Sequence, residues 1–308
     1  MTRVMAIVIA TYQRPDGLGR LLDSIVKTAK PAGWHLTVIV VDNDEENSAA
    51  PTLTAFESSL DLVSIVEPTQ GIPFARNAGT QAALGANAER IVFIDDDERV
   101  ESDWLLELTL AHEQFGAPIT MGCVLTEFEE TPPAWAEESG AFQRRIFANG
   151  TALDFAITAN VMVDSEILRG NERPFDESLR YSGGSDLQLF AELRASGNKI
   201  VYASKAVAHE LFPASKVNVT WLTRRQYRRG LNRSTTLRQL DASAARVAKR
   251  VVAGCVSIGR GASRYFAGKV LGRPLLHLDG RLQVAYGWGM LAGLAGVKYQ
   301  EYRTVHGS

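Results

Sequence analysis

The sequence feature that most constrains the fold is a short apolar segment, residues 90–94, followed at once by four acidic residues, 95–98. Adjacent carboxylates repel one another, and beside a buried strand they are costly to desolvate unless a positive charge neutralises them. Mg²⁺ or Mn²⁺ would do this, because hard divalent cations take oxygen ligands and bridge carboxylates to phosphates. The alternative is a solvated acidic turn. The pattern predicts a core strand whose carboxyl end is a candidate ligand site.

Strand and helix patterns alternate along the first two thirds of the chain. Aliphatic and β-branched runs predict strands, and apolar residues at helical spacing predict the helices between them. The expected strands are 4–10, 36–41, 63–66, 91–94 and 199–203, and the expected helices are 17–30, 52–60 and 71–84. This rhythm predicts an α/β fold with a mostly parallel sheet, flanked by helices, and functional loops at the strand ends.

Composition argues against several classes of protein. A net charge of −2 and a pI near 6.2 argue against a dedicated nucleic-acid binder. No apolar segment reaches the roughly 18 residues of a convincing transmembrane helix, and residues 1–10 do not read as a signal peptide. The two cysteines are far apart and lack metal-ligand spacing, as expected of reduced thiols. We therefore expect a cytoplasmic protein.

Polar residues that suit a nucleotide follow the first strands. Asp42 could accept a hydrogen bond from the imide N–H of uracil, Tyr12 could lie against the base, and Arg76 could hold a phosphate through its planar guanidinium. The alternatives are that Asp42 caps the segment after it and that Arg76 pairs with a surface acid. The first turn has no Gly-x-Gly-x-x-Gly and the chain no Walker loop, so dinucleotide-dependent and P-loop enzymes lose their main support.

Four motifs in this half resemble, in their order, those of one known family. They are Thr-Tyr-Gln-Arg-Pro at 11–15, Val-Asp-Asn-Asp at 41–44, Ala-Arg-Asn-Ala-Gly at 75–79 and Ile-Asp-Asp-Asp at 94–97. Together they resemble the family 2 glycosyltransferases, enzymes of the GT-A fold. The resemblance covers residues 3–212 and implies a nucleotide-sugar donor bound by Thr11, Tyr12, Arg14, Asp42, Arg76, Asp95 and Asp96. The family's Asp-x-Asp motif falls on Asp95 and Asp97, which implies a divalent metal, Mn²⁺ or Mg²⁺, on the donor diphosphate.

Motifs in the second half extend the resemblance. Gly-Gly-Ser-Asp at 183–186 resembles the family's Gly-Gly-Glu-Asp motif, which implies that Asp186 is the catalytic base, with Ser185 where the family usually has Glu. The alternative for Asp186 is a cap on the helical pattern that follows. Residues 158–163 resemble the segment near donor sugar and acceptor, so the resemblance places Asn160, Gly184 and Ser185 in an acceptor pocket. His209, expected in a loop after the strand at 199–203, resembles a late metal-binding His; a purely structural His is the equal alternative.

Two regions lie outside these motifs. Residues 127–147 contain consecutive prolines and are expected to form a mobile loop over the site, with Trp135 either stacked on a sugar or anchoring the loop in a core. Residues 216–308 are basic with interleaved aromatic and apolar residues, which suits helices on an anionic membrane surface; a helical appendage with solvated charges is the alternative. We expect a catalytic domain over 1–215 and a basic helical region over 216–308, with peripheral contact to the inner face of the cytoplasmic membrane.

The combined pattern predicts an inverting, metal-dependent glycosyltransferase that moves one sugar from a nucleotide-sugar to a saccharide or lipid-linked saccharide in surface-polysaccharide synthesis. Asp42 favours a UDP-sugar, with GDP and dTDP open. Transfer of a single sugar is expected, because the Gln-x-x-Arg-Trp motif of processive synthases is absent from the sequence. Two other classes stay open. A nucleotidyltransferase acting on a sugar phosphate would usually carry a Gly-rich basic loop that residues 11–15 do not provide, and a non-catalytic nucleotide-sugar-binding assembly partner is the third possibility.

Overall fold

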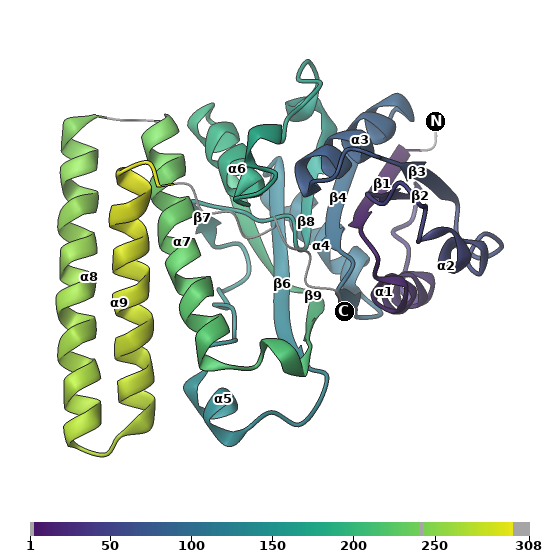
Figure 1. Ribbon diagram of the computed structural model, residues 1–308. Coiled ribbons are helices and arrows are strands. Elements are labelled where there is room, and N and C mark those ends of the chain that lie inside the picture. The colour runs from purple at the N-terminus through teal and green to yellow at the C-terminus, as the bar shows by residue number, and fades with distance from the viewer. Residues whose placement is uncertain (1–2, 241–242, 298–308) are drawn as a thin grey trace. The chain divides into compact units, whose positions relative to one another are not determined.

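The computed structural model describes residues 3–240 and 243–297, which form two compact units (Figure 1). The first unit runs from the N-terminal strand to Leu125 and from Arg144 to Leu211. The second consists of Thr126–Gln143 and the described residues from Phe212 to Val297. The expected domain boundary at residue 215 lies close to the point at residue 212 where the chain enters the second unit. That expectation, however, places residues 126–143 in the catalytic domain, whereas they belong to the second unit.

The first unit is built on a mixed sheet. Its parallel part contains, in spatial order, β3 (Leu62–Val66), β2 (Trp34–Asp42), β1 (Arg3–Thr11) and β4 (Arg90–Asp95). The sheet continues through β8 (Val161–Asp164), β6 (Ile119–Phe128), β9 (Ile200–Phe212) and β5 (Glu98–Val100), and β7 (Ala152–Leu153) pairs with β9. In this second part β8 runs antiparallel to β4 and β6, and β9 runs antiparallel to β5 and β7. The α/β class is confirmed, although the sheet is mostly parallel only in its first part.

Helices follow the strands of this unit. They are α1 (Pro15–Lys27), α2 (Ala50–Thr54), α3 (Ile72–Gly85), α4 (Trp104–Phe115) and α6 (Ser185–Ala195), with short 3₁₀ turns η1 (Ser165–Leu168) and η2 (Glu177–Leu179). α1 begins with Pro15, whose missing N–H costs nothing at a first helical position, and it buries a stripe that includes Leu18, Leu21 and Leu22. The helix expected over 52–60 is shorter, because most of the backbone bonds after Thr54 join residues three apart and form turns.

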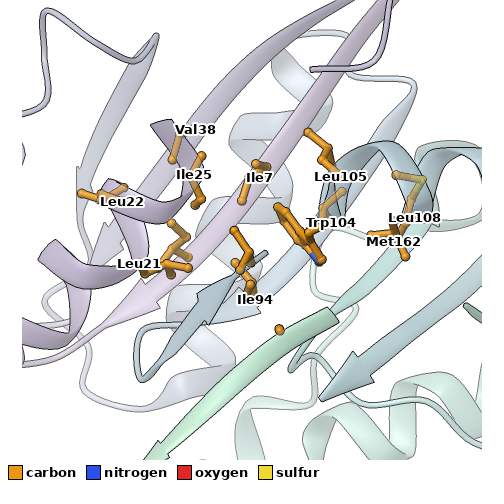
Figure 2. Packing of buried hydrophobic residues seen from close by; sticks show 14 of the residues in the cluster. Ile7, Leu21, Leu22, Ile25, Val38, Ile94, Trp104, Leu105, Leu108 and Met162 are labelled. Carbon is orange, nitrogen blue, oxygen red and sulfur yellow. The ribbon is translucent and has the colours of Figure 1, made fainter. Parts of the chain in front are cut away.

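Strand β1 is covered on both faces, which explains its unbroken apolar sequence. Ile7 and Ile9 belong to a cluster that contains side chains of α1 and α4, and Figure 2 shows Ile7 together with Leu21 and Trp104 of this cluster. Ala6 and Val8 belong to the cluster on the other face. Successive side chains of a strand point to opposite faces, so a doubly covered strand has no polar position. The covered part of β1 therefore ends near Thr11, and the polar residues that follow lie at the edge of the sheet.

The second unit is mainly helical. It contains α5 (Ala134–Ser139), a 3₁₀ turn η3 (Ala214–Lys216), α7 (Val219–Leu240), α8 (Ala244–Val270) and α9 (Pro274–Leu294). α9 packs against both α7 and α8 (Figure 1). None of the helices in the described ranges is long and apolar enough to cross a lipid bilayer.

Of the chain's two free thiols, Cys123 on β6 is buried and Cys255 on α8 is exposed.

Residues 126–143 belong to the second unit because their aromatic side chains join its core. Phe142 is fully buried, stacks on Trp221 with ring planes 9° apart, and meets the Phe212 ring edge to face at 5.6 Å. Trp135 is half-buried, with its ring 6.1 Å from that of Phe142. Of the two roles expected for Trp135, the structure therefore places it as an anchor of this segment in a core.

Candidate active site

The carboxyl ends of β1 and β4 lie side by side, because the two strands are parallel neighbours and Ala10 is in register with Asp95. Residues after β1 therefore meet the acidic run after β4. The Thr11 hydroxyl donates to Asp96 Oδ2 at 2.8 Å. Arg14 donates from Nη1 to Asp96 Oδ1 at 2.9 Å, and the same nitrogen lies 3.3 Å from Asp97 Oδ2. Two segments more than 80 residues apart thus form one polar cluster, as the strand pattern predicts.

Arg76 joins this cluster from α3. Its side chain is only 8% exposed, and Nη2 donates to Asp95 Oδ1 at 2.8 Å. Arg76 does pair with an acid, as one interpretation of the sequence held, but the acid belongs to the candidate site. Asp95 also donates its backbone N–H to Glu98 Oε2 at 3.2 Å, which joins the first and last residues of the acidic run 95–98.

Sequence reasoning missed two members of the site, Glu210 and Arg144. Glu210 on β9 is in register with Glu98 on β5, and Arg144 donates to Glu210 Oε2 through Nε at 3.0 Å and Nη2 at 2.6 Å. In the sequence, both are charged residues that no motif or spacing marks as part of a site. Only the antiparallel pairing of β5 with β9 brings them to the acidic run.

The cluster carries more negative than positive charge. Five carboxylates (Asp95, Asp96, Asp97, Glu98 and Glu210) face three guanidinium groups (Arg14, Arg76 and Arg144). Burial, followed by repulsion from Asp96 and Glu210, raises the pKa of Asp97 to about 7. Burial also raises the pKa of Glu98, whose Oε1 is buried without a hydrogen-bond partner among the described residues. The arrangement favours a bound cation.

The carboxylates of the cluster fit a metal ion whose remaining ligands come from the substrate. Within the described ranges, no three or more His, Cys, Asp or Glu side chains are grouped so that they could hold a metal ion. Mg²⁺, however, is usually held by one or two carboxylates and substrate phosphates, with water filling its remaining positions. Asp95 and Asp97 would be two such hard oxygen ligands, beside a cluster that is short of positive charge. The residues therefore suit a metal that binds together with a diphosphate.

His209 does not share this environment. It lies within β9, which continues to Phe212, and not in a loop after a strand that ends near residue 203. Successive residues of a strand point to opposite faces, so its ring projects away from the side of Glu210. Its Nε2 lies 3.0 Å from Glu101 Oε1. This geometry agrees with the alternative that His209 has a purely structural role. The prediction that His209 lies in a loop is wrong.

Asp42 is fully buried, and its carboxylate is used by the backbone. Oδ2 accepts from the N–H of Ala49 at 2.7 Å and Oδ1 from that of Asp44 at 3.1 Å. These bonds cap the loop after β2, which was the structural alternative. Tyr12, on the neighbouring loop, is half-buried. Contact of either residue with a nucleotide base stays a prediction.

Asn160 is a packing residue in this structure. It is fully buried, its Oδ1 accepts from Trp104 Nε1 at 2.8 Å, and its Nδ2 donates to the carbonyls of Cys123 and Ala206, both at 2.9 Å. The amide has no exposed atom for a sugar. In this structure the side chain ties three segments of the first unit together, and an acceptor contact of Asn160 stays a prediction.

The Gly-Gly-Ser-Asp segment forms the start of α6. Gly184 is the N-cap residue with φ 92°, and Ser185 is buried at the first helical position. Asp186 is half-buried in the first turn, where its Oδ1 accepts from the N–H of Leu187 at 2.8 Å. Asp186 is not the N-cap residue, but it does bond to the first turn. A carboxylate in the first turn of a helix interacts favourably with the positive end of the helix dipole.

Residues 6–172, more than half of the chain, match the profile of the family described as Glycosyl transferase family 2. The chain belongs to this family and is a glycosyltransferase. It is 31% identical over 228 residues to the succinoglycan biosynthesis protein ExoM of Rhizobium meliloti (strain 1021), a match that covers 73% of this chain and 72% of ExoM. It is also 30% identical over 121 residues to the poly(ribitol-phosphate) beta-glucosyltransferase of Bacillus spizizenii, covering 38% of this chain and 18% of that protein.

Solved structures of S. aureus TarS share the fold. The structure of TarS 1–349 in complex with UDP aligns with a TM-score of 0.54 and 14% identity, over 99% of this chain and 95% of the other. The complex of TarS 1–349 with UDP-GlcNAc aligns with a TM-score of 0.53 and 13% identity over the same shares. The expected GT-A fold is confirmed. The family match ends before α6 and so does not reach Asp186.

Proposed function

We propose that this glycosyltransferase moves a single sugar from a nucleotide-sugar to a saccharide or lipid-linked saccharide acceptor, with inversion, and that it contributes to a surface polysaccharide. The observation that carries the proposal is the acidic cluster at the adjoining ends of β1 and β4, where Arg14 and Arg76 lie among Asp95, Asp96 and Asp97. Carboxylates and guanidinium groups at the carboxyl edge of a parallel sheet suit a metal-bound diphosphate.

Each charged residue has a defined part in this proposal. Asp95 and Asp97 would hold Mn²⁺ or Mg²⁺, which as a Lewis acid stabilises the charge on a departing diphosphate. Asp96 is bonded by Thr11 and Arg14 and positions the loop after β1. Arg14 is 39% exposed and can reach a phosphate, whereas the buried Arg76 is held by Asp95. Arg144 keeps Glu210 neutralised, which limits the negative charge that the donor meets.

Asp186 would be the general base. The acceptor hydroxyl oxygen attacks C1 of the donor sugar, its proton passes to the Asp186 carboxylate, and the bond from C1 to the diphosphate oxygen breaks. Attack from the face opposite the leaving group inverts the anomeric carbon. A positioned base contributes about 10²–10⁴-fold to such a step.

The relatives of the chain favour a particular donor and acceptor. The solved relative TarS binds UDP and UDP-GlcNAc, which favours UDP as the nucleotide, with GDP and dTDP as the alternatives. ExoM acts in succinoglycan biosynthesis, and the Bacillus relative is a poly(ribitol-phosphate) glucosyltransferase, which favours a polymer or its lipid-linked precursor as the acceptor. An acceptor of this kind is consistent with peripheral contact at the inner face of the cytoplasmic membrane.

The proposal is tested by separating donor binding from transfer. We expect one of UDP, GDP, dTDP or CDP to raise the Tm of the purified chain, and to do so only with Mn²⁺ or Mg²⁺, since a ligand that binds the folded state stabilises it by mass action. Asp186→Asn should keep this shift but lower the transfer rate, measured with the matching nucleotide-sugar, by about 10²-fold or more.

The matched control is Asp23→Asn on α1, an exposed carboxylate whose recorded partner is Lys27. This variant should transfer sugar at the wild-type rate. Unchanged turnover in Asp186→Asn would remove the base assignment. A shift with nucleotide that is the same in the presence of a chelator would remove the metal from the site.

A further inference from the structure

Exposed apolar side chains gather on one helix of the second unit. Val252, Phe266 and Val270 of α8 are 61%, 63% and 84% exposed, and Val256 on the same helix is 43% exposed. Single exposed apolar residues are ordinary, whereas a group of them along one helix marks a contact surface. α8 therefore presents a surface that the rest of the described chain leaves uncovered.

The packing of α8 on α9 fixes which way this surface points. Gly254, Gly261 and Gly268, spaced seven residues apart, are the buried residues of α8. A Cβ at Gly261 would lie 2.7 Å from the backbone nitrogen of Val284 on α9, so the two backbones are in close contact. At 100° per residue, the side of α8 opposite to these glycines carries Val252, Val256 and Val270. Phe266 projects in a direction close to that of these three valines.

One side of the α8–α9 pair carries polar contacts between the two helices, and the other carries exposed apolar side chains. Arg264 pairs with Asp279 and Ser257 donates to the carbonyl of Gln283, which marks the polar side. Helical geometry directs residues 281, 285 and 288 of α9 to the opposite side, and it directs Phe266 of α8 to that side as well. Trp288, which is 55% exposed, therefore shares a side with Phe266. We call Val252, Val256, Phe266, Val270 and Trp288 the apolar face.

Next to Trp288 lies a shallow apolar groove with two arginines. The groove has a volume of about 390 Å³ and is lined by side chains of α7 and α9, including Arg224, Tyr227, Arg281 and Val284. An indole or phenol ring beside guanidinium groups suits a boundary between hydrocarbon and charged headgroups, because the ring has an apolar body and a polar end. The groove extends the apolar face across α9 to α7.

Basic residues predominate among the charges of α8 and of the chain around it. α8 contains six Lys and Arg residues and no Asp or Glu, and Lys249, Arg260 and Lys269 are exposed. Over residues 212–297 as a whole there are fifteen Lys and Arg and two Asp, a net charge of +13 in a chain of net charge −2. Two copies of this face would oppose like charges. A nucleic acid would match the charge but would leave Phe266 and Val270 in water.

We infer that the apolar face lies on the surface of an anionic lipid bilayer, with Val252, Phe266, Val270 and Trp288 in the headgroup layer and the surrounding Lys and Arg on lipid phosphates. An amphipathic helix with a basic polar side binds in this manner, through buried apolar area and attraction to anionic lipids. The inference deepens the membrane contact in the proposed function, on which it rests, by naming the residues that make it.

The test is flotation of the full chain with vesicles of phosphatidylcholine alone or mixed with phosphatidylglycerol. We expect the chain to float with the mixed vesicles, and binding to fall as salt rises, because exposed charges are screened. Phe266→Ser combined with Val270→Ser should weaken vesicle binding about tenfold or more. Lys249→Glu combined with Arg260→Glu should do the same with the mixed vesicles.

Matched controls are Leu110→Ser on α4, an exposed leucine of the first unit, and Lys30→Glu after α1. Both should float like the wild type. Wild-type chain that stays with neither vesicle, or a Phe266/Val270 variant that floats unchanged, overturns the inference. The inference is also overturned if the wild-type chain is a dimer and the Phe266/Val270 variant is a monomer. Binding of the chain to duplex DNA without binding to vesicles would overturn it as well.

Nucleotide-induced Tm shifts, measured on the same variants, keep this inference apart from the proposed function. The apolar-face variants should retain the wild-type shift, since none of their positions belongs to the acidic cluster. Loss of flotation with an unchanged shift supports the inference. Flotation without any nucleotide shift would leave the bilayer contact standing and remove the proposed donor site.

Discussion

At the scale of single residues, Asn160 shows how a polar side chain can define a core. Its φ of 98° lies in the left-handed region that residues other than glycine rarely adopt, at a cost of about 1–3 kcal/mol. The cost is offset by bonds from both ends of the amide to Trp104, Cys123 and Ala206, which lie on α4, β6 and β9. Asn160 therefore joins three elements just before β8 begins.

We predict that Asn160→Ala lowers the free energy of unfolding by about 3–5 kcal/mol, because it removes the side-chain bonds to two buried carbonyls and to the Trp104 N–H. Urea titration followed by circular dichroism measures the change. Asn198→Ala is the matched control, since Asn198 makes one recorded side-chain bond, to the Leu193 carbonyl, and should cost about 1 kcal/mol. A loss at Asn160 no larger than at Asn198 would contradict the role described for it.

At the scale of elements, α8 and α9 are held together by backbone contact at glycines. Gly261 faces Val284 and Gly280, and Gly254 faces Leu291. Glycine lowers helix propensity, so these residues would weaken isolated helices, and their value lies in the close approach that they permit. The pairing of the two helices is therefore sensitive to a single methyl group at the seam.

Gly261→Ala should destabilise the second unit by about 2 kcal/mol or more, because its Cβ would lie 2.7–2.8 Å from backbone atoms of α9. Gly259→Ala, two residues earlier on the same helix, meets nothing within 4 Å and should raise stability by up to about 1 kcal/mol. Thermal unfolding of both variants gives opposite signs if the seam is as described. A gain in Tm at Gly261 would mean that the two helices are not in contact there.

The strand ends of the candidate site could be predicted from sequence, whereas its far side could not. β1 and β4 contain unbroken apolar runs, so their ends and the polar residues Thr11 and Asp95 follow from hydropathy. β9 continues past residue 203 through half-buried polar positions such as His209 and Glu210, where hydropathy no longer marks a strand. Arg144 reaches Glu210 only through tertiary pairing, for which the sequence carries no local signal.

At the scale of the whole molecule, each unit has its own core and its own charge. The family match covers residues 6–172, which lie mostly in the sheet-containing unit. The net charge of the whole chain is only −2, yet residues 212–297 carry +13. Residues 126–143, the other part of the second unit, carry −5, so the second unit is basic and the first is acidic. Composition averaged over the chain conceals this separation, because it counts both units together.

The exposure of Cys255 and the burial of Cys123 provide a built-in attachment point for a spectroscopic probe. Burial raises the pKa of the Cys123 thiol, so little of it is thiolate near neutral pH, whereas Cys255 is open to reagent on α8. We predict that the native chain consumes one equivalent of maleimide quickly and the second only after unfolding, as a thiol titration would show. A nitroxide attached there, with no engineered residue, would report oxygen accessibility at the helix that carries the apolar face. Rapid modification of both thiols in the folded chain would show that the β6 core opens on the timescale of labelling.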